Sequence, residues 1–178
     1  MNLWHDVPRG QNLPEEFNVI IEIPKGSPNK YEIDKETGLI ALDRANYSSA
    51  PYPFDYGFVP QTLWDDGDAL DVIVLSTFPL QTGILVRARP VALMEMTDDG
   101  ESDYKIVAVL SDDKRWDDVK DLADLNQHNL KEFKHFFETY KELKEKDVIV
   151  TIDGIKGKAE AIEAVKKSIQ LYDEKFAK

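Results

Sequence analysis

Three carboxylates crowd into one short turn of this chain. Asp66, Asp68 and Asp71 lie within six residues, and the turn leads directly into the apolar run 72–75. Carboxylates this close raise one another's pKa unless a cation lies among them. Aspartate and glycine are also ordinary turn residues, so the motif alone equally fits a solvated surface turn. The turn is therefore a candidate site for a hard cation such as Mg²⁺.

Spacing argues against other sites for these residues. If Asp66 were position one of an EF-hand loop, Asp71 would stand where glycine is required and Thr77 where a bidentate glutamate is required. The segment 154–158 precedes a predicted helix as a P-loop does, but its glycines are too close and Ala159 replaces the magnesium-binding Ser or Thr. The chain has no cysteine and no Ser/His nucleophile signature. Calcium-loop, P-loop and nucleophilic mechanisms are thus disfavoured.

Charged side chains also recur at the ends of predicted apolar stripes. Residues two apart in a strand share a face, so Lys30 and Glu32 point the same way. Arg44 follows Leu42 and Ile40 on one face, where an unpaired guanidinium would be costly. We therefore expect Arg44 to meet an anion at the end of an apolar stripe.

Two further strands repeat this arrangement. Glu22 shares a face with Ile20. Asp103 and Lys105 share a face with Val107. A single charged side chain at a strand end usually extends to reach water. The same arrangement on several strands favours a common site for these charges.

The candidates form two chemical sets. The oxygen ligands for a hard cation are Asp66, Asp68, Asp71, Asp98, Asp103 and Glu22. The cations and phenols are Lys30, Arg44, Lys105, Lys141, Tyr52, Tyr56 and Tyr140. Magnesium held by few carboxylates keeps open positions for water and phosphate, and Arg and Lys neutralise phosphate oxygens. Together the two sets indicate phosphoryl chemistry.

The sequence predicts strands followed by helices, and these elements must position the candidate residues. Strands are expected at 17–23, 30–34, 39–44, 72–75, 84–96 and 104–110, the first three as a meander and the last two as a hairpin through the turn 98–100. Apolar residues at helical spacing predict a helix over 126–144, capped by Asp124 or Asn126. A strand at 148–152 and a closing helix from about Lys158 follow. This order suggests an α+β domain, mainly β, built on a small closed or Greek-key barrel.

Composition limits the class of protein further. With 178 residues, 42% of them hydrophobic, we expect one domain spanning 1–178. The formal charge of -12 opposes binding to nucleic acid or anionic membrane. No run of about 18 apolar residues occurs, and absent cysteines exclude disulfides and thiolate metal sites, so a cytoplasmic location is expected. His128 and His135 are expected on a solvated helix face.

Eight short motifs follow one another in a characteristic order. They lie at 22–24, 30–34, 43–44, 52–57, 66–71, 96–98, 103–105 and 135–141. In order and approximate spacing they resemble the motifs of the soluble, family I inorganic pyrophosphatases of prokaryotic type, nearly from end to end. Two positions depart from the family pattern: Ala69 stands where proline or glutamate is usual, and Asp55 where asparagine is frequent. Neither position is an expected ligand.

The resemblance implies an OB-type five-stranded closed barrel with flanking helices, and Mg²⁺-dependent hydrolysis of inorganic pyrophosphate to two phosphates. The implied main metal ligands are Asp66, Asp71 and Asp103, with Asp98 and Glu22 completing the coordination. Asp68 would accept the proton of the attacking water. The implied phosphate-binding residues are Lys30, Arg44, Tyr56, Tyr140, Lys141 and, on the electrophilic side, Lys105, with Tyr52 and Glu32 in support. The resemblance also suggests a homohexamer.

Two other functions stay open from the sequence. A magnesium phosphohydrolase acting on nucleotides or polyphosphate would use the same residue types. An OB-fold binding module would place single-stranded nucleic acid on aromatics and a basic groove, although the negative charge opposes this.

Overall fold

The main sheet of the protein closes on itself. The computed structural model describes residues 1–144 and 148–176. Five strands pair around a ring in the order β1 (Phe17–Ile23), β4 (Asp55–Phe58), β5 (Asp71–Leu75), β8 (Lys105–Leu110) and β6 (Leu85–Asp98). Strand β1 pairs with both β4 and β6 and so completes the ring. The predicted five-stranded closed arrangement is confirmed.

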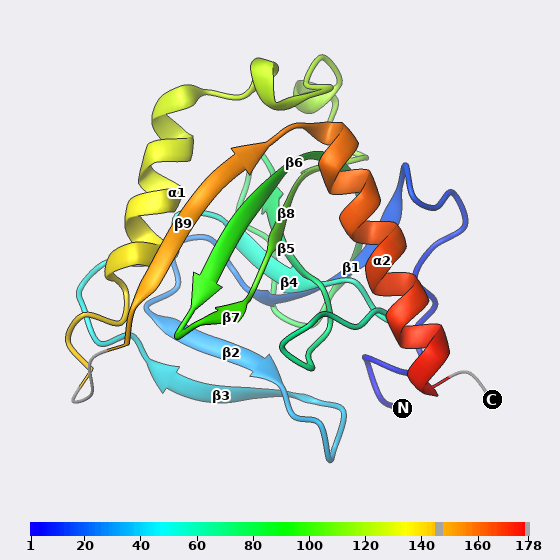
Figure 1. The fold of residues 1–178 in the computed structure, drawn as a ribbon, viewed down its shortest axis with the longest axis horizontal. Coiled ribbons are helices and arrows are strands. Elements are labelled where there is room, and N and C mark those ends of the chain that lie inside the picture. Colours follow the sequence, from blue (N-terminus) through cyan, green and yellow to red (C-terminus); the bar gives the residue numbers. More distant parts are fainter. Residues whose placement is uncertain (145–147, 177–178) are drawn as a thin grey trace.

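The remaining elements surround this ring (Figure 1). Strands β7 (Glu101–Ser102) and β9 (Val150–Lys156) extend β6, while β2 (Asn29–Ile33) and β3 (Ile40–Ala45) form a separate hairpin. Helices α1 (Gln127–Thr139) and α2 (Lys158–Phe176) flank the ring, and two 3₁₀ turns, Lys114–Trp116 and Leu122–Asp124, precede α1. Within the described segments no helix is long and apolar enough to cross a membrane.

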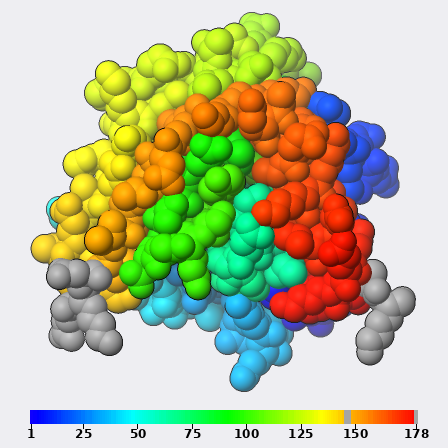
Figure 2. Space-filling view, in the orientation of Figure 1, coloured from blue at the N-terminus to red at the C-terminus, as the bar shows by residue number. Residues whose placement is uncertain are grey.

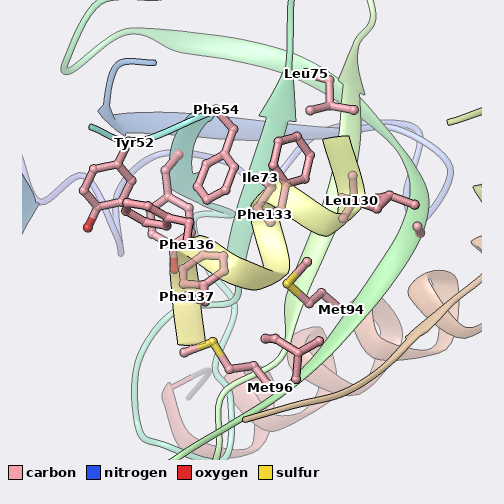
Figure 3. Close-up of a cluster of buried hydrophobic side chains, with 14 of the residues drawn as sticks. Tyr52, Phe54, Ile73, Leu75, Met94, Met96, Leu130, Phe133, Phe136 and Phe137 are labelled. Atoms are coloured by element: carbon pink, nitrogen blue, oxygen red, sulfur yellow. The ribbon is translucent and has the colours of Figure 1, made fainter. Parts of the chain in front are cut away.

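An aromatic cluster fixes α1 on the ring (Figure 3). Phe133 and Phe137 of α1 pack on Phe54, with ring centroids 5.0 and 5.3 Å away. Tyr52 lies against Phe136 at 4.7 Å. Each such side chain contributes about 1.5–3 kcal/mol when fully buried. The expected core role of the helical aromatic stripe is confirmed, and it holds the end of α1 near the strands.

Strand β4 was not expected from the sequence. It has four residues, and all of them are buried, so no alternation marks it. Its Gly57 lies so close to β1 that an added Cβ would sit 2.0 Å from the Ile20 carbonyl oxygen. A glycine inside a short aromatic segment was the available signal for this close approach.

The expected opening meander is wrong. Strand β1 pairs with β4 and β6, whereas β2 and β3 pair with each other. The face of β3 that carries Arg44 is also not an inward apolar stripe, because Leu42 is 61% exposed. Ile40 of the same strand instead packs against the buried cluster that contains Trp4 and Phe58.

Two predicted boundaries shift. The helix expected to reach Lys144 ends at Thr139, whose hydroxyl donates 2.7 Å to the His135 carbonyl oxygen. The strand expected at 148–152 instead spans Val150–Lys156, because it pairs along β6 as far as Leu93. The closing helix from Lys158 is confirmed.

The buried Asp55 links two loops beside β4. Its Oδ1 accepts the backbone N–H groups of Lys25 and Leu80, both at 2.9 Å. The Ser76 hydroxyl oxygen lies 2.7 Å from both Asp55 Oδ2 and the Phe78 carbonyl oxygen. A hydroxyl has one hydrogen, so it donates to only one of these two oxygens. If it donates to the Phe78 carbonyl oxygen, an amide at position 55 could donate to the Ser76 hydroxyl oxygen.

We predict that Asp55→Ala lowers the free energy of unfolding by about 2–4 kcal/mol, because it leaves two backbone donors unpaired. Asp55→Asn keeps the accepting oxygen and supplies the amide donor, so we expect a change below about 1 kcal/mol. Urea unfolding followed by tryptophan fluorescence measures both. Equal losses for the two variants would show that the hydrogen bonds to Oδ1 are not what stabilises these loops.

Candidate active site

One cavity of about 720 Å³ opens between the β2–β3 hairpin, the acidic turn and the end of α1. Eleven of the twelve residues expected to bind or react line it: Glu22, Lys30, Tyr56, Asp66, Asp68, Asp71, Asp98, Asp103, Lys105, Tyr140 and Lys141. They come from segments spread over the chain from β1 to the end of α1. The fold therefore brings together residues that the sequence only suggested as a set.

Strand register places a buried lysine beside two carboxylates that line this cavity. Asp71 and Lys105 are direct neighbours in the parallel pair β5–β8. The Lys105 ammonium lies 2.6 Å from Asp71 Oδ2 and also binds Asp103, two residues earlier on the same face. Lys105 is only 2% exposed. Burial lowers its pKa, but Asp103 and Asp71 outweigh burial and raise it above the ordinary value, so the group is charged.

Several carboxyl groups of the cavity have a raised pKa, because they are buried and nearby positive side chains do not balance their negative charge. Burial, with Asp71 and Asp103 nearby, raises the pKa of Asp66 to about 7. Burial and the charge of Asp71 raise the pKa of Glu22 well above its usual range, although the Ile33 N–H donates to its Oε1 at 2.8 Å. Burial also raises the pKa of Asp71. Ionising all of these groups together needs additional positive charge.

The acidic turn is shaped by hydrogen bonds from its backbone N–H groups. Gly67 has φ +87°, a conformation that other residues rarely adopt. The Asp68 N–H donates to Asp66 Oδ1 at 3.0 Å, and the Trp64 N–H donates to the Asp68 carbonyl at 2.7 Å. The turn closes where Thr62 Oγ1 accepts the Leu70 N–H at 3.0 Å. Backbone and side-chain hydrogen bonds together thus shape the turn, and Asp66, Asp68 and Asp71 line the cavity.

The lining fits a divalent cation by its chemistry. Eleven of the lining residues are acidic and five are basic. Among the described residues no three carboxylate or imidazole groups are arranged to hold one metal ion. Lysines bind Asp68, Asp71, Asp98 and Asp103 instead. Oxygen donors in excess of cations are the set that Mg²⁺ prefers. The carboxylates that remain in excess are therefore suited to a hard cation.

The hairpin β2–β3 contributes a lysine and an arginine, each paired with carboxylates of the same hairpin. Lys30 and Arg44 are neighbours in its register. The Lys30 ammonium lies 2.6 Å from Glu32 and 3.1 Å from Asp43, so the expected Lys30–Glu32 proximity is confirmed. Arg44 is outside the cavity lining, but its guanidinium lies 6.0 Å from the Tyr140 ring centroid, and Tyr140 lines the cavity. The buried Arg44 Nε has no hydrogen-bond partner among the described residues, while Nη1 of the same guanidinium lies 2.6 Å from Asp43 Oδ2.

The opposite wall is formed by the end of α1 and by β4. Lys141 binds Asp98 of β6. Tyr56 and Tyr140 are both buried, and burial raises the pKa of each phenol above its usual range. Both phenols therefore keep their protons near neutral pH and can donate hydrogen bonds to phosphate oxygens.

The structure also adds residues to the sequence-based list and places one supporting candidate elsewhere. Lys35, in the turn after β2, lines the cavity and binds Asp68. Lys144 also lines the cavity. The only signal for these was a lysine close to a motif. Tyr52 instead packs in the aromatic core, while Glu32 lines the cavity.

The histidines are outside the cavity lining, although the His5 ring stacks on Trp4, which lines it. His128 and His135 are exposed on α1, as expected. His5 Nδ1 lies 2.8 Å from the Tyr172 hydroxyl, at the opposite end of the chain. They are not among the cavity's lining residues.

Comparisons with known proteins agree with this geometry. A family model described as "Inorganic pyrophosphatase" matches residues 19–173. The chain is 46% identical over 180 residues to an inorganic pyrophosphatase of Haloferax volcanii, covering 99% of both chains. It is 48% identical over 169 residues to a soluble inorganic pyrophosphatase of Zea mays, covering 95% of this chain and 78% of the relative.

A solved structure is similar over nearly its whole length. The crystal structure of inorganic pyrophosphatase from Thermus thermophilus superposes with a TM-score of 0.94 at 42% identity, covering 97% of this chain and 99% of that one. Both the sequence match and the fold match thus extend across the segments that build the cavity. The chain belongs to the inorganic pyrophosphatase family.

Proposed function

We propose that this protein hydrolyses inorganic pyrophosphate to two phosphates in a Mg²⁺-dependent reaction. The observation that carries the proposal is one cavity in which carboxylates in excess face lysines and buried phenols. The carboxylates suit a divalent cation, while the lysines and phenols suit phosphate oxygens. The relatives named as inorganic pyrophosphatases support the choice of substrate.

Five of the carboxylates would coordinate the metal. Asp66, Asp71 and Asp103 are the proposed main ligands, with Asp98 and Glu22 completing the coordination. When bound, Mg²⁺ makes a water molecule more acidic and neutralises charge on the phosphate oxygens. A cation among Asp66, Glu22 and Asp71 also favours their ionised forms, which burial alone disfavours.

The other residues of the cavity act on water and phosphate. We propose that Asp68 accepts the proton of the attacking water, since its side chain lines the cavity beside Asp66. The proposed phosphate-binding residues are Lys30, Arg44, Tyr56, Lys105, Tyr140 and Lys141. Their charges and O–H donors compensate the negative charge that develops on the transferred phosphoryl group. Lys30, Arg44 and Tyr56 would share catalysis with Asp68 in this way.

Phosphate release from three substrates tests the proposal. Purified protein is incubated with pyrophosphate, ATP or tripolyphosphate at equal concentration in excess Mg²⁺, from neutral to alkaline pH. We expect rapid release from pyrophosphate and slow release from the other two, with EDTA abolishing turnover. No release from pyrophosphate would refute the proposal, and faster release from ATP or tripolyphosphate would favour a nucleotide or polyphosphate phosphohydrolase.

The assembly, domain count and location follow the expectations from the sequence. We propose a homohexamer, and the exposed apolar Leu39 and Leu42 of the hairpin are compatible with subunit contacts. Light scattering during gel filtration measures the mass of the assembly, and we expect the mass of six chains. A single domain and a cytoplasmic location stay predictions.

A further inference from the structure

A fully buried hydroxyl lies in the loop that carries the acidic turn. This loop covers residues 59–70, between the end of β4 at Phe58 and the start of β5 at Asp71. Figure 2 shows it, in teal, lying against helix α2, in red. Thr62 of the loop has no exposed surface. Its hydroxyl group must therefore find its hydrogen-bond partners inside the protein.

The Thr62 hydroxyl joins the two ends of the loop. Its O–H donates to the Val59 carbonyl oxygen at 2.6 Å, and its Oγ1 accepts the Leu70 N–H at 3.0 Å. The Val59 N–H also donates to the Leu70 carbonyl oxygen at 3.0 Å. Because a hydroxyl is both a donor and an acceptor, one side chain satisfies a backbone group at each end of the loop.

The N-terminal segment holds Thr62 in place. The Trp4 indole N–H donates to the Thr62 carbonyl oxygen at 2.8 Å, and this contact is buried. The Gln61 N–H donates to the Trp4 carbonyl oxygen at 2.8 Å. Trp4 also belongs to the same buried cluster as Ala69 of the acidic turn. The position of the Thr62 hydroxyl is therefore set by contacts outside the turn.

The hydrogen bond from Leu70 holds the backbone between two proposed metal ligands. Asp71 follows Leu70 directly, and Asp66 precedes it in the same turn. A cation that binds both carboxylates needs them at a fixed separation. Any conformational freedom that the turn keeps in the metal-free protein must be lost on binding, which weakens affinity.

We propose that Thr62 is a positioning residue that sets the separation of Asp66 and Asp71 before a cation binds. It acts through the Leu70 N–H and is not among the residues that line the cavity. This inference rests on the proposed function of the cavity. It assigns Thr62 a role in Mg²⁺ affinity that is separate from its contribution to folding.

Two substitutions separate the hydroxyl group from the shape of the side chain. Thr62→Val keeps the branched shape but removes the donor and the acceptor. We expect it to bind Mg²⁺ about three- to tenfold more weakly, the scale of one lost hydrogen bond. Thr62→Ser keeps the hydroxyl, so we expect Mg²⁺ affinity within about twofold of wild type.

Hydrogen–deuterium exchange of the metal-free protein in EDTA measures the order of the turn directly. Exposure times are kept short, so that only local opening contributes to exchange. We expect amides of residues 63–71 to exchange about fivefold faster in Thr62→Val, because the loop has lost a hydrogen bond at its base. Thr62→Ser should exchange at close to the wild-type rate.

Asp55→Ala is the matched control for lost stability. It removes buried hydrogen bonds to Lys25 and Leu80, in loops that do not carry the acidic turn. It is expected to lower the free energy of unfolding, so it shows what destabilisation alone does to metal binding. We expect its Mg²⁺ affinity to stay within about twofold of wild type, because Asp55 makes no hydrogen bond to the turn.

Isothermal titration with MgCl₂ alone measures the affinity of all these variants. The proposal requires weaker Mg²⁺ binding and faster exchange in Thr62→Val, recovery of both in Thr62→Ser, and wild-type affinity in Asp55→Ala. Unchanged Mg²⁺ affinity in Thr62→Val overturns it, as does a loss that Thr62→Ser fails to recover or that Asp55→Ala reproduces.

A milder variant keeps the test decisive if Thr62→Val does not fold. Trp4→Phe keeps an aromatic ring but removes the indole N–H that holds the Thr62 carbonyl oxygen. It should show the same two changes to a smaller degree, about twofold each, and no change in either overturns the proposal. Wild-type protein that binds Mg²⁺ but leaves pyrophosphate intact refutes the proposed function instead.

Discussion

Asp68→Asn is expected to lower kcat for pyrophosphate by about 10²–10⁴-fold, the range for loss of a general base. The amide has the shape of the carboxylate but cannot accept the proton of the attacking water. The turn should keep its form, because Asp68 contributes its backbone N–H and carbonyl to the hydrogen bonds that shape it. We therefore expect Mg²⁺ affinity to change by less than about threefold, since Asp68 is not among the proposed ligands.

Phosphate-release kinetics and Mg²⁺ titration of the same preparations measure the two quantities separately. Asp65→Asn is the matched control, because it makes the identical chemical change three residues earlier at a carboxylate bound to α2. We expect that control to retain kcat. Loss of Mg²⁺ affinity with kcat retained at saturating metal would identify Asp68 as a ligand rather than a base.

The sequence predicted more of the candidate site residues than of the strand pairing. Motifs record which chemical groups are present, and Asp66, Asp71, Lys30 and Lys105 all line one cavity. What joins Asp71 to Lys105 is the register of a parallel pair of strands far apart in sequence, and no local pattern encodes it.

Strand pairing explains most of what the sequence did not predict. Strand β1 is buried on both faces, so alternation along it could not indicate its partners. Its true neighbours are β4, which is too short to carry a pattern, and β6. The pairing of Lys35 with Asp68 likewise depends on where the β2–β3 hairpin rests, which is a tertiary fact.

Lys105→Met is expected to be the most destabilising change in the cavity. Lys105 is 2% exposed and binds both Asp71 and Asp103. Removing one member of a buried ionic cluster leaves the others uncompensated, which typically costs about 3–5 kcal/mol of unfolding free energy. We expect this loss in EDTA at pH 7, measured by urea unfolding. Lys114→Met, which removes a highly exposed lysine paired with Asp117 at 3.4 Å, is the control and should change stability by less than about 0.5 kcal/mol.

Adding Mg²⁺ separates the structural role of Lys105 from its catalytic role. A ligand that binds only the folded state stabilises it, and the variant offers Asp71 and Asp103 without their internal cation. Saturating Mg²⁺ should therefore stabilise Lys105→Met more than wild type. Turnover should still fall by about 10²–10³-fold in the refolded, metal-loaded variant, because a donor to the developing phosphate charge is missing. Metal-free stability equal to wild type would instead show that Asp71 and Asp103 do not need the ammonium, and that the cavity tolerates its negative charge by another route.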